Sequence, residues 1–100
     1  MALIKVTASQ LKSQAEQLKS LNVRFREATG KLQETELALK SMWEGEANDA
    51  FHKAFSSDKV QMDNFYNAIE MYVAKLQTIA QKYEQAEQIN TNTGNTRTYK

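Results

Sequence analysis

Apolar residues recur every seven positions along two long stretches of this 100-residue chain, and no other feature constrains the fold as much. The first stretch runs through Leu11, Leu18, Phe25, Leu32 and Leu39. The second has apolar residues at alternating steps of three and four from Phe51 to Ala86, interrupted at Asp58. Such a repeat is typical of helices that pack side by side. Because the chain also contains no proline, the sequence predicts an all-α fold.

The tripeptide Trp43-Glu44-Gly45 separates the two stretches. Gly45 tolerates the positive φ that a tight turn requires, and Trp43 offers a large surface that can close the end of a helical bundle. We therefore predict an antiparallel helix-turn-helix hairpin over residues 1–88, with helices at 8–41 and 47–88 and a turn at 42–46. Thr7 and Gln10 match a capping box at the start of the first helix. Residues 89–100 are polar and predict a disordered tail.

Apolar residues outside the repeat predict a further helical layer. Val23, Gly30 and Leu37 lie on the far side of the first helix, and Tyr66 and Val73 widen the apolar stripe of the second. We expect these five residues to form a dimer interface that makes a four-helix bundle. The sequence leaves open whether the partner is a second copy or a related chain.

Several classes of function are excluded by the composition. Thirteen basic and twelve acidic residues alternate along the chain, so there is no basic block to bind nucleic acid. The chain has no cysteine, and His52 is its one histidine, which we interpret as structural. We predict no enzymatic activity, no cofactor and no metal. The sequence shows no signal peptide and no apolar run of transmembrane length, which by itself indicates a cytoplasmic protein.

A chain of one hundred residues with two long helices and a central Trp43-Glu44-Gly45 resembles the Trp-X-Gly hundred-residue family of early secreted antigen-like proteins. The resemblance implies secretion without a leader through a type VII system, from a cytoplasmic pool, and it overrides the cytoplasmic interpretation. The expected function is that of a dimeric effector, carrier or co-export partner in bacterial virulence or interbacterial interaction. Its partners would be itself or a related family member, and the secretion machinery with its ATPase.

The resemblance also implies an export signal of the form Tyr-x-x-x-Asp/Glu, which Tyr83 and Glu87 match. Tyr66 and Glu70 have the same spacing, but they lie in the middle of the second helix. Folding the chain at Gly45 predicts that residues 82–88 project past the hairpin, accessible to a receptor. From the residues alone, Tyr83 also continues the apolar repeat.

Two other functions are compatible with the sequence. A membrane-permeabilising effector would expose its apolar helix faces to lipid, although neither helix is strongly basic on its polar face. An intracellular structural coiled coil would have the same composition and repeat. Dye release from vesicles and the presence of the protein in culture supernatant distinguish these alternatives from a secreted hairpin.

Overall fold

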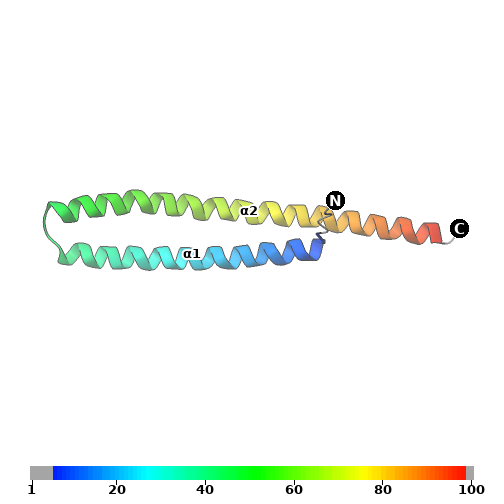
Figure 1. The fold of residues 1–100 in the computed structure, drawn as a ribbon, viewed down its shortest axis with the longest axis horizontal. Helices are drawn as coiled ribbons and strands as arrows, with labels where there is room; N and C mark the ends of the chain where they lie inside the picture. The colour runs from blue at the N-terminus through cyan, green and yellow to red at the C-terminus, as the bar shows by residue number, and fades with distance from the viewer. Residues whose placement is uncertain (1–5, 99–100) are drawn as a thin grey trace, which may run out of the picture. The chain divides into compact units, whose positions relative to one another are not determined.

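Two long helices make up this computed structural model, which describes the backbone of residues 6–98 and the side chains of residues 6–89. Helix α1 spans Ala8–Met42 and helix α2 spans Glu46–Thr98. The chain reverses direction between them and forms an antiparallel hairpin (Figure 1). No strand occurs over residues 6–98, so the predicted all-α hairpin is confirmed.

Three of the four helix ends lie within one residue of the positions predicted from the sequence. Helix α1 begins at Ala8 because Thr7 and Gln10 form the predicted capping box. The Thr7 N–H donates to Gln10 Oε1 at 3.0 Å, and the Gln10 N–H donates to Thr7 Oγ1 at 3.1 Å. Two backbone donors that the first helical turn leaves without partners are thereby satisfied.

The fourth end, the C-terminus of α2, differs from the prediction. The sequence predicts a helix that ends at residue 88 and a disordered tail over 89–100, whereas α2 continues to Thr98. Asparagine and threonine lower helix propensity only moderately, and a helix that is already formed extends at little cost per residue. The part of the predicted tail that is described is therefore helical, and residues 99–100 lie outside the described part.

The chain divides into two compact units, which we call the turn unit (residues 19–70) and the end unit (residues 1–18 and 71–100). In the turn unit, the most buried side chains are polar, namely Asn22, Thr29, Glu36 and Asn48. In the end unit, the buried side chains are apolar and mostly small, namely Ala8, Ala15, Val73 and Ala80. Neither unit fully buries a large side chain among the described residues.

The residues between the helices are not those that the repeat predicted. The buried positions of α1 do recur every seven residues, but they are Ala8, Ala15, Asn22, Thr29 and Glu36, which we call the contact row. Leu11, Leu18 and Phe25 are half-buried beside this row, and Leu32 and Leu39 are exposed. The distance between packed helices depends on the side chains at their contact, so a row of smaller residues lets the backbones approach and leaves the large ones at the flank.

The helices of the turn unit are aligned so that Phe25 of α1 packs against Phe65 of α2. Their ring centroids are 5.3 Å apart, and their ring planes are at 68°. This edge-to-face arrangement is favourable for two aromatic rings.

Candidate functional site

Trp43 and Gly45 have different structural roles in the turn. The Trp43 side chain is half-buried, and its ring centroid lies 5.8 Å from that of Phe51. Gly45 has a φ of 123°, a conformation that other residues rarely adopt. A Cβ added to Gly45 would meet no atom within 4 Å, so the need for glycine there is conformational rather than steric. The tripeptide therefore shapes the reversal of the chain.

Asn48 binds the C-terminal end of α1, a contact that the sequence analysis missed. Its side-chain amide donates to the Trp43 carbonyl and, at 3.4 Å, to the Lys40 carbonyl. Carbonyls at the end of a helix have no partner within the helix, so Asn48 acts as a cap supplied by α2. Its side chain is 7% exposed, and Oδ1 has no partner among the described residues.

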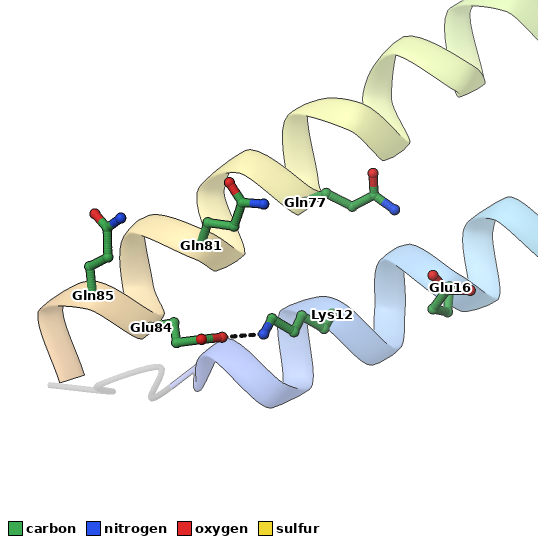
Figure 2. A pocket seen from close by; sticks show the side chains of 6 residues that line it. All are labelled: Lys12, Glu16, Gln77, Gln81, Glu84 and Gln85. Atoms are coloured by element: carbon green, nitrogen blue, oxygen red, sulfur yellow. Dashed lines mark hydrogen bonds and ion pairs between the residues drawn. The ribbon is translucent and has the colours of Figure 1, made fainter. Parts of the chain in front are cut away.

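Glu87 caps the other end of α1. The Ala8 N–H donates to Glu87 Oε1 at 3.0 Å, which joins residues 79 positions apart. A carboxylate at a helix N-terminus interacts favourably with the helix dipole. One turn away, the Lys12 ammonium pairs with the Glu84 carboxylate (Figure 2). Charged side chains of α2 therefore hold the first two turns of α1.

These contacts correct the predicted overhang. Residues 82–88 were expected to project past the hairpin, but Glu84 and Glu87 contact Lys12 and Ala8 because α2 runs beside α1 up to its first turn. Tyr83 stays 45% exposed, one helical turn from Glu87. Of these two residues, Glu87 contacts the start of α1.

A polar groove lies between α1 and α2 in the end unit. Figure 2 shows Lys12 and Glu84 pointing toward one another across it. The groove has a volume of about 640 Å³, and its lining residues are Lys12, Glu16, Gln77, Gln81, Glu84 and Gln85. These side chains offer hydrogen bonds to a polar partner, but the groove has no aromatic wall to enclose a small apolar ligand.

The residues predicted for a dimer interface have different environments. Val23 and Leu37 are 44% and 52% exposed on α1. Val73, in contrast, is 4% exposed, because the hairpin itself already buries it. Val73 therefore belongs to the core of one chain.

The other two predicted interface residues, Gly30 and Tyr66, line a second polar groove in the turn unit. The Arg26 guanidinium lies 4.8 Å above the centroid of the Tyr66 ring, an arrangement typical of a cation–π contact. The Tyr66 hydroxyl, as a hydrogen-bond partner, raises the pKa of Arg26 above its usual value. Arg26 therefore stays positively charged, and this side of the turn unit is polar.

On each helix, most of the exposed large apolar side chains occupy two positions of the seven-residue repeat that lie side by side on the helix surface. Phe25, at the repeat position of Leu32 and Leu39, contacts Phe65, so both helices of the turn unit contribute to one apolar side. Surfaces of this kind mark interaction sites in soluble proteins. We call the six exposed large apolar residues at these positions in the turn unit the apolar face: Leu21, Leu32, Leu39, Met42, Phe51 and Phe65.

His52 contacts a buried carboxylate of the contact row. Its Nδ1 lies against Glu36 Oε1, and the Glu36 side chain is 4% exposed. This contact agrees with a structural role for His52. Among the described residues, no group of three histidine, cysteine or acidic side chains could hold a metal ion. Neither helix, over the described residues, has a stretch long and apolar enough to cross a membrane.

The family of proteins of 100 residues with WXG matches residues 3–88. The wild-type secreted protein EsxB from Bacillus anthracis strain Sterne has a similar structure, with a TM-score of 0.73 and 25% identity over 83% of this chain and 89% of its own. A selenomethionine-labelled EsxB gives a TM-score of 0.76 and 24% identity over 87% of this chain and 99% of its own. No curated protein matches this chain.

Proposed function

This chain belongs to the WXG100 family of proteins of 100 residues with WXG, and from that membership we propose that it is a non-catalytic protein secreted through a type VII system. It leaves a cytoplasmic pool without a leader, driven by the secretion machinery and its ATPase. It acts as a dimeric effector, carrier or co-export partner in bacterial virulence or interbacterial interaction. The family match over residues 3–88 carries this proposal, and the similarity to secreted EsxB supports it.

Tyr83 and Glu87 form the export signal in this proposal. Tyr83 is exposed on α2 and therefore available to a receptor. Replacing Tyr83 with alanine should leave the hairpin folded and the protein inside the cell. Tyr72→Ala is a matched control, because Tyr72 is a tyrosine of the same helix with a similar exposure, 53% against 45%, outside the motif. Immunoblots of culture supernatant and cell pellet measure the difference, and normal secretion of folded Tyr83→Ala would remove the signal.

The apolar face supports a dimer with a second copy of the chain. Fully burying one large apolar side chain contributes about 1.5–3 kcal/mol, and these six are already partly covered. In a symmetric dimer each of them counts twice, so the total competes with an association cost of roughly 4–15 kcal/mol. Two hairpins that pack by this face make the four-helix bundle expected from the sequence. The face excludes Val23 and Leu37, so the interface proposed here differs from the one expected from the sequence.

Two leucines of α1 test which surface is the interface. Leu32 belongs to the apolar face and is 50% exposed, while Leu37 belongs to the interface expected from the sequence and is 52% exposed. We expect Leu32→Asp to give a monomer, because dimer formation would bury an unpaired carboxylate. Leu37→Asp should remain a dimer. Light scattering coupled to gel filtration reports the mass, and the opposite result would assign the interface to the side of Leu37.

A pull-down from culture supernatant tests the whole proposal at once. A tagged chain should appear outside the cell together with an untagged second copy. Recovery of a related family member instead would indicate a heterodimer. Tagged protein found only in the cell lysate would favour an intracellular coiled coil.

A further inference from the structure

Glu87 is already engaged within the folded chain. Its Oε1 accepts the Ala8 N–H at 3.0 Å in a partly buried position. Ala8 is the first residue of α1 and is 3% exposed. A receptor that bound the Glu87 carboxylate directly would have to compete with this helix end for Oε1 or use the remaining acceptor positions of the carboxylate.

Three neighbouring donors at the start of α1 have local partners. Thr7 and Gln10 satisfy each other through the capping box, and the Leu11 N–H donates to the Thr7 carbonyl at 3.0 Å. The Ala8 N–H is bound from α2 instead, so this bond connects the first residue of α1 to the helix that carries the motif. Tyr83, in contrast, presents 45% of its surface to solvent.

We propose that Glu87 is a positioning residue, which holds the motif segment of α2 against the first turn of α1, and that Tyr83 is the residue a receptor contacts. The proposal deepens the export role of Tyr83 and Glu87 and rests on it. The signal then consists of three parts, Tyr83, Glu87 and the Ala8 N–H, and it is complete only when α1 is folded onto α2. Secretion would thus require a folded hairpin.

Removing the hydrogen-bond donor, the Ala8 N–H, instead of the acceptor, the Glu87 carboxylate, distinguishes a positioning role of Glu87 from its direct recognition by a receptor. Ala8→Pro eliminates the N–H and leaves the Glu87 carboxylate and Tyr83 in place. Proline is favoured at the first position of a helix, and the preceding Thr7 is not helical, so the substitution suits this site. Thr7→Ala is the matched control, because it breaks the capping box at the same helix end without touching the Ala8–Glu87 bond.

We expect secretion to fall by a similar factor in Ala8→Pro and Glu87→Ala, with no further loss in the double variant. Thr7→Ala should be secreted as the unchanged protein is. Normal secretion of folded Ala8→Pro, together with loss in Glu87→Ala, would overturn the proposal, because the carboxylate would then be read directly. Equal loss in Thr7→Ala would also overturn it, since general fraying of α1 would be the cause.

A second variant keeps the proposal testable if Ala8→Pro loses helix content by circular dichroism. Glu87→Gln retains an oxygen that can accept the Ala8 N–H but has no charge, so we expect it to be secreted. Loss of secretion equal to that of Glu87→Ala would contradict a positioning role.

Hydrogen exchange on purified protein tests the cap separately from export. Glu87→Ala should speed amide exchange in the first turn of α1 by about fivefold, the factor expected for the loss of one helix cap. Unchanged amide exchange in this variant would show that Glu87 does not cap α1, whatever the secretion result. Normal secretion of Tyr83→Ala would instead remove the export signal while leaving this measurement valid.

Discussion

Both ends of α1 are capped by side chains of α2, but by different means. At the turn, a buried neutral amide from Asn48 binds the carbonyl of Lys40 in α1 and that of Trp43 just after it, and Trp43 packs on Phe51. At the start of α1, the carboxylate of Glu87 binds a backbone N–H. Near it, Lys12 pairs with Glu84, and the side chains of these two residues are 52% and 44% exposed.

This difference indicates which end of α1 a partner can alter. Contacts made by packing and buried neutral groups are little affected by ions, whereas exposed charge pairs weaken as salt is added, with a screening length of about 10 Å at 0.1 M. The turn is therefore a fixed part of the fold, and the start of α1 is the end whose contacts solvent, salt or a receptor can replace. Substitutions at both ends test this difference.

Trp43→Ala should have the largest effect. It removes a half-buried indole and its contact with Phe51, and we expect the free energy of unfolding to fall by about 2–3 kcal/mol. Tyr83→Ala, an aromatic truncation in the end unit, should lower it by less than about 1 kcal/mol because Tyr83 is largely exposed. Urea unfolding followed by circular dichroism measures both. Equal effects would contradict the distinction between the two ends.

Gly45→Ala should destabilise the protein while Gly30→Ala stabilises it. Gly45 has positive φ, so alanine there would be strained by about 1–3 kcal/mol. Gly30 lies inside α1, and a Cβ added there would meet nothing within 4 Å. Alanine at that position should raise the free energy of unfolding by about 0.4–1 kcal/mol. Thermal unfolding curves compare the pair, and a stabilising Gly45→Ala would show that the turn does not depend on its conformation.

Asn48→Ala should lower the free energy of unfolding by about 1 kcal/mol, the usual contribution of a hydrogen bond. The loss is moderate because the substitution also removes the buried Oδ1, which has no partner among the described residues. We expect the same loss at low and at high salt, since the amide is neutral. A loss that disappears in 0.5 M salt, roughly the concentration at which surface charges are screened, would indicate an electrostatic cap at the turn as well.

Lys12→Gln should have the smallest effect. It breaks an exposed ion pair with Glu84, and such pairs contribute about 0.2–1 kcal/mol at low salt. The effect should vanish as salt is added. Lys19→Gln serves as a control for the loss of a surface charge, because Lys19 lies at the same repeat position two helical turns after Lys12. Persistence of the Lys12 effect at high salt would mean that packing, and not charge, holds this end.

Much of the fold follows from the sequence, because its signals are local. The seven-residue repeat predicts the two helices, the capping box predicts the start of α1, and Gly45 predicts the reversal. The repeat contains two neighbouring apolar positions, however, and it cannot tell which one faces the other helix and which one faces outward. Leu32 and Leu39 were assigned to the contact between the helices for this reason, and they are exposed.

The contacts of the candidate site were harder to predict because they join distant residues. Tyr83 and Glu87 were selected by their spacing and by the family resemblance. That Glu87 meets Ala8, 79 positions away, depends on the alignment of the helices and on side-chain direction. Asn48 is a similar case, since nothing in its local sequence shows that its amide reaches back to Lys40.

The buried Asn22 determines how the two helices of the turn unit are aligned along each other. Two helices that repeat every seven residues can slide by one repeat and still match apolar with apolar, so the repeat alone leaves several alignments close in energy. Asn22 donates to the Tyr66 carbonyl and to Glu70, both at 3.1 Å. A slide would leave this buried amide without acceptors, at a cost of about 1–3 kcal/mol. One polar side chain thus favours a single alignment among several to which the apolar residues give similar energies.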